Sequence, residues 1–349
     1  MANKKGRGLG RLGGRGRSLD GRRKKRRHSG KEESTRDPAA RILEKLEGVE
    51  PDGRVLVMYG SHADVAFADG EVRFSLLSPK VHKHFGLCVG DRVYTKAGAT
   101  EQERIIIART PRRTEVRRKR GEEDRTGHVI AANVEQLLVT IALREPPLRT
   151  GAVDRYLLLA SVLGLEPVLV LTKTDQAPAD DPGWDVLEPY RAMGVPIVAT
   201  SAVSKEGLDR LIAVLRGRVS VFSGHSGVGK SSLCQALELA DAPEAGEMST
   251  SGGRVRGRHT TSVARLLDIP GGGWVVDTPG VRAIGLVDLR REDVAVHFPE
   301  FADAARRCGY TDCMHVDEED CEVRNAAGAG EIPDARYQSY LRLLESLEE

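Results

Sequence analysis

The stretch "VSVFSGHSGVGKSSLCQALEL" at residues 219–239 constrains the fold of this chain more than any other. A short apolar run typical of a buried strand leads into a glycine-rich loop, and a helical pattern begins at Lys230. The loop fits G-x-x-x-x-G-K-[ST], in which glycines let successive backbone N–H groups point inward around an anion at the start of a helix. Because a strand and a helix flank the loop, it predicts a nucleotide phosphate site in an α/β domain.

The predicted phosphate site assigns separate tasks to a few side chains. Lys230 is placed to neutralise charge on the β- and γ-phosphates, and the Ser231 hydroxyl is placed to bind Mg²⁺. Downstream, "WVVDTPG" brings Asp277 to a strand end, where it would hold Mg²⁺ through water, and Gly280, whose N–H would contact the γ-phosphate. The nucleotide-binding residues predicted in the loop itself are Gly224, His225, Ser226, Gly227, Val228, Gly229, Lys230, Ser231 and Ser232.

The segment between these two motifs, "GEMSTSGGRVRGRHTTSV" at residues 246–263, has no apolar periodicity. It predicts a loop that closes over a bound triphosphate. Thr260 and Thr261 are both candidates to bind Mg²⁺ and the γ-phosphate, and we favour Thr261.

The run "VLVLTKTD" at residues 168–175 predicts a buried strand that ends in a base-reading loop. Asp175 can accept hydrogen bonds from guanine N1–H and the N2 amine, whereas adenine offers no such pair of donors, so the motif favours GTP over ATP. Lys173 would lay its aliphatic stem over the base, and backbone N–H groups in "ATSA" would meet guanine O6. The predicted base-site residues are Thr172, Lys173, Thr174, Asp175, Ser201 and Ala202.

Strands and helices alternate between residues 129 and 285, with continuous apolar strands such as "EQLLVTIAL" and helical runs such as "DRYLLLASVLGL". This alternation of apolar strands and amphipathic helices predicts a parallel sheet covered on both faces by helices. Ahead of it, short strands from residue 54 to 108 predict a small β-barrel, for which an oligonucleotide-binding (OB) fold is one candidate. We read residues 111–125 as a charged linker, and the residues after 288 as mainly helical.

Charge is distributed unevenly along the 349 residues. Residues 1–27 contain 12 Lys or Arg and one Asp, against a net charge of +2 for the whole chain, so the remainder is acidic. This Gly/Arg-rich arm has too few apolar residues for a core, and it fits either a solvated tail or an arm that binds RNA phosphates. No apolar run reaches the length of a membrane span, and no secretory signal pattern opens the chain.

Three of the five cysteines crowd near the C-terminus in the pattern Cys308-x₄-Cys313-x-His315-x₅-Cys321. Three thiolates and one imidazole complete a tetrahedral set with no open position, which is typical of structural zinc. We therefore expect Cys308, Cys313, His315 and Cys321 to hold one zinc ion that stabilises the fold.

The motifs, in this order, resemble those of the circularly permuted bacterial GTPases of small-ribosomal-subunit biogenesis, the RsgA (YjeQ) family. The resemblance covers about residue 53 to the C-terminus and includes "GHSGVGKSSL", "GRHTTS", "DTPGVRAIGL", the Cys/His cluster and "RYQSYLRLLESL". It implies an α/β P-loop GTPase domain, circularly permuted, between an N-terminal OB-fold barrel and a small, mainly helical zinc domain. The limits we expect are 1–38 for a disordered basic arm, 50–112 for the barrel, 117–286 for the GTPase domain and 287–349 for the zinc domain.

The resemblance also implies a cytoplasmic monomer that binds GTP or GDP, Mg²⁺ and Zn²⁺, contacts the 30S subunit and its 16S rRNA, and hydrolyses GTP faster when bound there. It implies catalysis by His259, because Val281 stands where many GTPases place a glutamine that orients water. The family usually has Asn at the position of Thr172, so we expect weaker guanine affinity here. The alternatives are an ATPase or kinase with the same loop, and an RNA-binding module whose guanine nucleotide is structural or regulatory.

The reversed order of the two nucleotide motifs is compatible with the same fold, because a parallel sheet depends on which strands are neighbours and not on where the chain starts. In this order the chain leaves the "DTPG" segment and runs directly into the zinc domain. We expect a segment that orders with GTP to reposition that domain.

Overall fold

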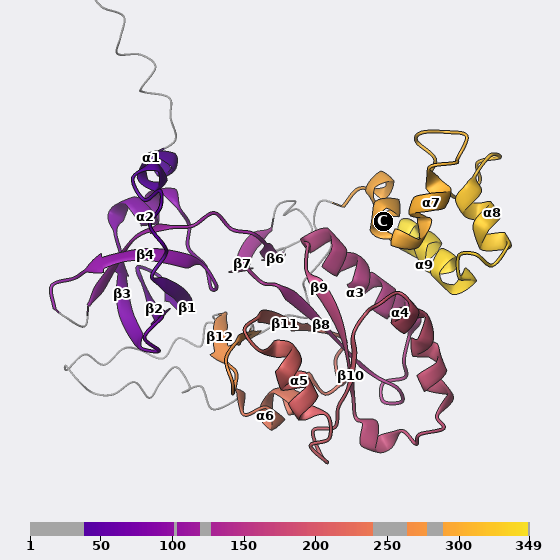
Figure 1. Ribbon diagram of the computed structural model, residues 1–349, viewed down its shortest axis with the longest axis horizontal. Coiled ribbons are helices and arrows are strands. Elements are labelled where there is room, and N and C mark those ends of the chain that lie inside the picture. Colours follow the sequence, from indigo (N-terminus) through magenta and orange to yellow (C-terminus); the bar gives the residue numbers. More distant parts are fainter. Residues whose placement is uncertain (1–37, 101–102, 119–126, 240–263, 278–288, 348–349) are drawn as a thin grey trace, which may run out of the picture.

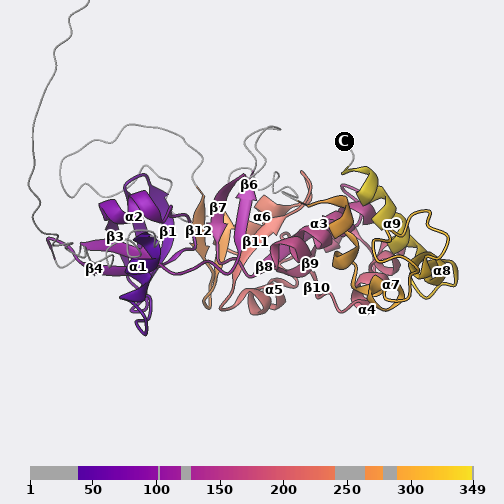
Figure 2. The same cartoon turned by 90° about the horizontal axis from the view of Figure 1, so that it is seen from above.

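The computed structural model describes residues 38–100, 103–118, 127–239, 264–277 and 289–347. Figure 1 and Figure 2 show three parts in a row along the longest axis: a barrel, a central sheet with its helices, and a helical C-terminal part. Among the described residues, no helix combines the length and the apolar character needed to cross a bilayer.

The N-terminal part is a five-stranded barrel, as the alternating apolar pattern predicts. The second and third strands form a hairpin at Asp69-Gly70, a dipeptide typical of tight turns, where Gly70 adopts φ +84°, a conformation that glycine reaches without strain. Pairing of the first strand with the fourth closes the barrel around an apolar core that includes Val55, Val65 and Ile106. The strands are β1 (Gly53–Tyr59), β2 (His62–Phe67), β3 (Val72–Leu77), β4 (Arg92–Ala97) and β5 (Arg104–Arg109), with helices α1 (Pro38–Glu44) and α2 (Pro79–His84).

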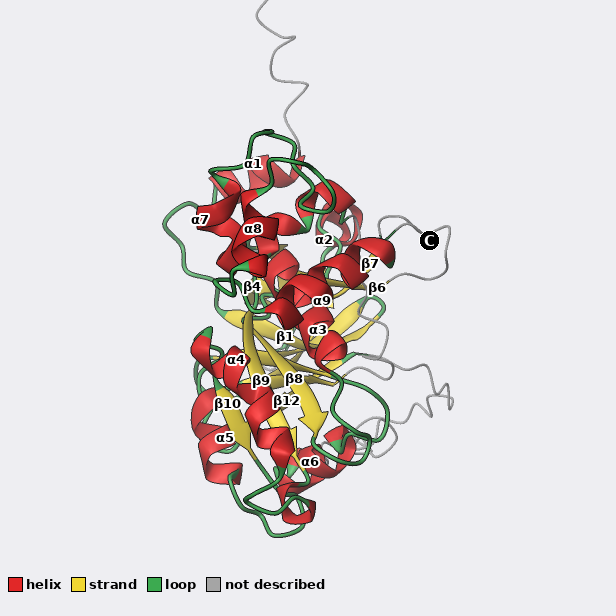
Figure 3. Cartoon of the chain, turned by 90° about the vertical axis from the view of Figure 1, so that its right-hand side faces the viewer, coloured by secondary structure: helices red, strands yellow, loops and turns green. Residues whose placement is uncertain are grey.

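The central part is the α/β domain, with strand order β10-β9-β8-β11-β13-β12. Its first five strands are parallel, and only β12 runs antiparallel to its neighbour. Every residue of β8 and β11 is buried, because helices cover both faces of the sheet (Figure 3). The strands are β8 (Gln136–Ala142), β9 (Glu166–Thr172), β10 (Ile197–Ala199), β11 (Val219–Ser223), β12 (Arg265–Asp268) and β13 (Trp274–Asp277).

The helices divide between the two faces of this sheet. Helices α3 (Thr150–Leu163) and α4 (Glu188–Ala192) pack against one apolar layer, and α5 (Leu208–Leu215) and α6 (Lys230–Ala236) against the other. The segment "WDVLEPYRAMG", whose composition is typical of a helix, is only partly α-helical, because a 3₁₀ segment, η2 (Pro182–Leu187), precedes α4.

The reading of residues 111–125 as a simple charged linker is wrong for its described part. Strand β6 (Glu115–Arg118) pairs with β7 (His128–Ala132) as a separate two-stranded sheet. The Arg112 side chain is buried, and it donates two hydrogen bonds to the fully buried Asp91 carboxylate, at 2.8 and 2.9 Å. Charge in this segment therefore serves an internal ion pair as well as solvation.

The C-terminal part is helical, as predicted, and packs onto the central domain. Its core contains Phe298, Phe301 and Tyr340 together with Leu158 of α3. The Arg336 guanidinium, 4% exposed, forms ion pairs with Asp154 of α3 and, at 2.6 Å, with Glu300. The helices are α7 (Ala302–Ala305), α8 (Glu322–Gly328) and α9 (Asp334–Glu345), after three 3₁₀ turns, η5 (Arg291–Asp293), η6 (Ala295–His297) and η7 (Pro299–Phe301).

Candidate nucleotide and metal sites

The glycine-rich loop lies between β11 and α6, where its sequence context places it. Three of its glycines adopt positive φ: 144° at Gly224, 82° at Gly227 and 95° at Gly229. A side chain at Gly224 would place its Cβ 2.3 Å from the Thr140 carbonyl oxygen, so the loop can only take this path with glycine there. Lys230 Nζ donates to the carbonyls of Gly224 and His225, at 2.6 Å each, which holds the ammonium inside the curl of the loop.

The predicted base-reading loop lies against the predicted phosphate loop. Thr172, at the end of β9 and buried, places Oγ1 3.0 Å from the Ile141 carbonyl oxygen and also within hydrogen-bond distance of the Val228 carbonyl oxygen. Lys173 adopts φ +55° just after it, and its Nζ donates to the Glu145 carbonyl at 2.7 Å. Two motifs about 50 residues apart in the sequence therefore meet at one edge of the sheet.

Asp175 is exposed beside the "TSA" segment. Its Oδ1 accepts a 2.6 Å hydrogen bond from Ser201 Oγ, which in turn accepts from the backbone N–H groups of Val203 and Ser204. Thr174 N–H donates to the Thr200 carbonyl at 3.3 Å, which brings the turn after β9 alongside the turn after β10. An exposed carboxylate held from one side can accept ligand donors from the other.

Asp277 ends β13, the parallel neighbour of β11, so it emerges on the same edge as the phosphate loop. Its charge reaches Cys234 of α6: burial and then Asp277 raise the pKa of the Cys234 thiol to about 11. Ser231 and Ser232 are exposed at the start of α6. The predicted residues His259, Thr260, Thr261 and Gly280 lie outside the described residues.

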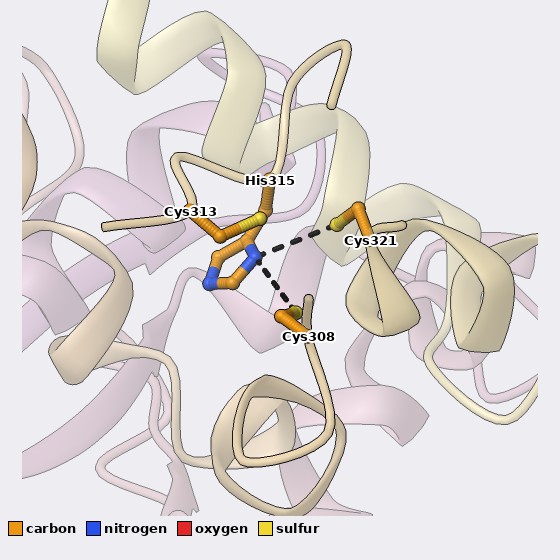
Figure 4. Close-up of side chains that lie close together, drawn as sticks. All are labelled: Cys308, Cys313, His315 and Cys321. Atoms are coloured by element: carbon orange, nitrogen blue, oxygen red, sulfur yellow. Dashed lines mark hydrogen bonds between the residues drawn. The ribbon is translucent and has the colours of Figure 1, made fainter. Parts of the chain in front are cut away.

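The four predicted metal ligands come together in the C-terminal part (Figure 4). Cys308, Cys313, His315 and Cys321 each offer a ligand atom, and these atoms lie within 4.8 Å of one another. His315 Nδ1 lies 3.5 Å from Cys321 Sγ and 3.7 Å from Cys308 Sγ. Burial lowers the pKa of the His315 imidazole, which favours the neutral form that binds metals. The cluster could hold a metal ion.

Three further residues, which the sequence motifs do not identify, hold the metal-ligand loop. Tyr337 and Tyr340 of α9 donate hydroxyl hydrogen bonds to the carbonyls of His315 and Met314, at 2.8 and 2.6 Å. Glu318 accepts from two backbone N–H groups of the same loop. They contact the backbone and not the ligand atoms, so ligand spacing carries no signal of them.

Comparison with known proteins gives one consistent result. A profile of the RsgA GTPase family matches residues 109–287. The small ribosomal subunit biogenesis GTPases RsgA of Pseudomonas aeruginosa and Azotobacter vinelandii are each 37% identical, over 89% of this chain and 91% of their own length. The chain belongs to the RsgA GTPase family.

Solved structures agree with this assignment. YjeQ from Thermotoga maritima has a TM-score of 0.70 at 31% identity, covering 86% of this chain and 99% of that one. YloQ, described as a circularly permuted GTPase, has a TM-score of 0.68 over 86% of this chain and 95% of its own, and at 24% identity it supports the fold alone. The predicted fold class is confirmed: a circularly permuted GTPase domain between a five-stranded barrel and a helical region with a Cys₃His cluster.

Membership of the RsgA family makes the chain a GTP hydrolase. It also accounts for the reversed motif order, since the base-reading loop after β9 precedes the phosphate loop after β11 in the chain while both lie on one sheet edge. The predicted domain limits stay predictions, although α1, with Ile42 and Leu43 packed on the barrel core, begins before residue 50.

Proposed function

We propose that this chain hydrolyses GTP to GDP and phosphate during late maturation of the 30S ribosomal subunit, binds 16S rRNA, and turns over faster on the 30S particle. The observation that supports this best is the contact of the Thr172 hydroxyl with the Val228 carbonyl oxygen, which joins the base-reading and phosphate loops into one site. The names of the curated relatives, small ribosomal subunit biogenesis GTPases, supply the ribosomal part.

Within this site, the residues around the two loops would bind the nucleotide. Asp175 would read guanine, the glycine-rich loop and Lys230 would hold the phosphates, and Ser231 would bind Mg²⁺. Asp277 would hold the same ion through water. Gly280, Thr261 and His259 keep their proposed roles at the γ-phosphate, the Mg²⁺ ion and the attacking water, although they lie outside the described residues.

The Cys₃His cluster is proposed to hold one structural zinc ion. Three sulfur donors and one nitrogen donor match a closed tetrahedral zinc set, and no open position remains for a substrate. A zinc ion there would link the loop of Cys313 and His315 to Cys321 at the start of α8, and so stabilise the C-terminal part.

The remaining proposals concern the cellular setting. We propose a cytoplasmic monomer that meets the 30S subunit directly, with no membrane partner. The basic segment of residues 1–27, which lies outside the described residues, would add non-specific affinity for RNA phosphates.

The decisive experiment measures GTP hydrolysis by the full chain with and without purified 30S particles. We expect slow intrinsic turnover and a large stimulation by 30S, because phosphoryl transfer depends mainly on positioning and on charge stabilisation. Purified 50S particles are the control. Salt-sensitive RNA binding without any 30S stimulation would instead favour an RNA-binding module with a structural or regulatory guanine nucleotide.

A further inference from the structure

A cavity of about 660 Å³ lies between the barrel and the central domain, away from both sites described so far. We call it the interdomain cleft and define it by Arg54, Arg92, Tyr94, Arg113, Glu135 and Arg218. Glu135 precedes β8 and Arg218 precedes β11, so the cleft lies at the amino ends of the parallel strands. The phosphate loop follows β11 and is therefore at the opposite edge of the sheet.

Two arginines face each other across barrel strands in this cleft. Arg54 of β1 and Arg92 of β4 are direct cross-strand partners, an arrangement in which like charges destabilise a sheet. Burial and then the Arg92 charge lower the pKa of the Arg54 guanidinium, and Glu135 offsets this only in part. The Arg54 guanidinium also lies over the Trp274 ring, with Cζ 4.7 Å from the ring centroid.

The carboxylates of the cleft offset the charge of these two arginines only in part. Arg54 Nη1 is buried and has no hydrogen-bond partner among the described residues, an uncommon and costly state for a charged group. Glu50 is 4.0 Å from Arg92, but its side chain is 93% exposed, so water screens this pair. Arg218 Nη1 lies 3.9 Å from Glu135 Oε1 and 3.3 Å from Glu166 Oε1. Arg218 therefore balances part of the negative charge of these two carboxylates.

We propose that the interdomain cleft is a second anion site, which binds a phosphate group and an adjacent unpaired base of single-stranded RNA. Arg54, Arg92 and Arg113 would hold the phosphate by charge-assisted hydrogen bonds. Tyr94, which lines the same cavity, would give the base a ring to stack on. Arg92 and Arg113 are exposed at the rim, so the cleft is open to a continuous RNA chain and not only to a small ion.

This inference rests on the RNA binding proposed above and adds the place where it occurs. It also explains why a sheet would keep two arginines opposite each other: a bound phosphate converts their repulsion into attraction. A cost in stability at a binding site is a common trade-off.

Trp274 allows a direct test, because it lies under Arg54 and only one other tryptophan, Trp184, is present. In the full chain carrying Trp184→Phe, we expect a short single-stranded RNA to change the Trp274 emission in a saturable way. Arg54→Gln and Arg92→Gln should each weaken this binding roughly tenfold. Each should also reduce the slope of log affinity against log salt by about 0.7.

The matched control is Arg191→Gln, which removes the same charge from an ion pair with Glu188 whose side chains are 53% and 65% exposed. It should leave both the RNA affinity and the salt slope unchanged. Arg92→Gln should also keep or raise the melting temperature, whereas loss of a merely structural arginine would lower it. If Trp184→Phe does not fold, filter binding of the same arginine variants in the natural sequence gives the affinities.

The proposal is overturned by RNA that leaves Trp274 emission unchanged, or by RNA affinity that is equal in Arg54→Gln and the parent. Inorganic phosphate and GMP are tested alongside, and either one binding as tightly as RNA would reassign the cleft to a small anion. Absence of 30S-stimulated hydrolysis would refute the proposed function, but it would leave the oligonucleotide result, and hence the cleft, standing.

Discussion

Thr172 contributes a single hydroxyl that lies within reach of two carbonyl oxygens from different segments, Ile141 at the end of β8 and Val228 in the phosphate loop. The resemblance to the family implies an Asn at this position, and from the sequence alone we expect only a loss. In the structure the shorter side chain still connects β9 to the phosphate loop. The weaker guanine affinity expected for Thr172 stays a prediction, but the connection between the loops does not depend on an amide.

Thr172→Val should separate this role from simple core packing. Valine has a similar shape, but it removes the hydroxyl that lies within reach of the Ile141 and Val228 carbonyl oxygens. We therefore expect the binding free energy of GTP to become less favourable by about 1–3 kcal/mol. Equilibrium titration with a fluorescent GTP analogue measures this. Ser220→Ala is the control, because the buried Ser220 hydroxyl bonds Gln136 at the other end of β8. Equal GTP affinities in the Thr172→Val variant and the parent would show that the Thr172 hydroxyl does not support nucleotide binding by linking β9 to the phosphate loop.

Asp175→Asn should change the preferred base from guanine to xanthine. An asparagine amide can donate to the xanthine 2-carbonyl, but it cannot accept both guanine donors, so GTP affinity should fall roughly 100-fold or more. Competition binding with GTP, XTP and ATP measures the preference. Ser201→Ala, which removes only the hydroxyl that donates to Asp175, should weaken GTP without selecting XTP. Unchanged preference in Asp175→Asn would place the base elsewhere.

At the scale of elements, the strands with a clear apolar pattern could be predicted, and those without one could not. Continuous apolar runs predicted strands β8, β9 and β11 and the positions of the loops that follow them. Strand β6, "EVRR", is charged, and its strand character comes from pairing with β7 and not from its own pattern. Strand β12 borders the barrel, pairing once with β1 through Arg265 and Val57, a tertiary contact that no local pattern reports.

The C-terminal elements show the same limit at the metal cluster. The ligand set could be predicted because its chemistry requires Cys and His at short spacing. The residues that position it could not, because Tyr337 and Tyr340 read as ordinary apolar-face residues of an amphipathic helix. Their hydroxyl contacts to the ligand loop depend on how α9 packs across it.

Removal of the metal should therefore unfold this part first. We expect Cys321→Ser, or treatment of the parent with a strong chelator, to abolish binding of one zinc per chain. The free energy of unfolding of the C-terminal part should then fall by at least several kcal/mol, because the free energy of metal binding contributes to the free energy of folding. The zinc content per chain is measured by elemental analysis, and unfolding of the C-terminal part is followed by tyrosine fluorescence during heating. Cys234→Ala, outside the cluster, should retain one zinc, and a zinc-free parent of normal stability would contradict the prediction.

For the whole molecule, the question is which parts can move when the nucleotide changes. The sequence suggested that the zinc domain is repositioned by the segment that precedes it. The structure adds a constraint, because Arg336 is 4% exposed and pairs with Asp154, which is 2% exposed, on α3 of the GTPase domain. Breaking such a buried pair costs about 3–5 kcal/mol. The C-terminal part and α3 should therefore move together or not at all.

Distance measurements in the GDP and GTP-analogue states test this prediction. A pair of probes on exposed positions of α3 and α9 should report the same distance in both states, while a pair on the barrel and α9 should change if the molecule rearranges.

Arg336→Met should release the constraint, since the thioether keeps much of the packing on Phe298 but leaves Asp154 without its ion-pair partner. In that variant we expect a lower unfolding free energy and a broadened α3–α9 distance. The exposed pair of Arg306 and Asp303 supplies the control variant, Arg306→Met. A state-dependent α3–α9 distance in the parent chain would show that the C-terminal part moves independently of α3, and that the buried ion pair does not fix it.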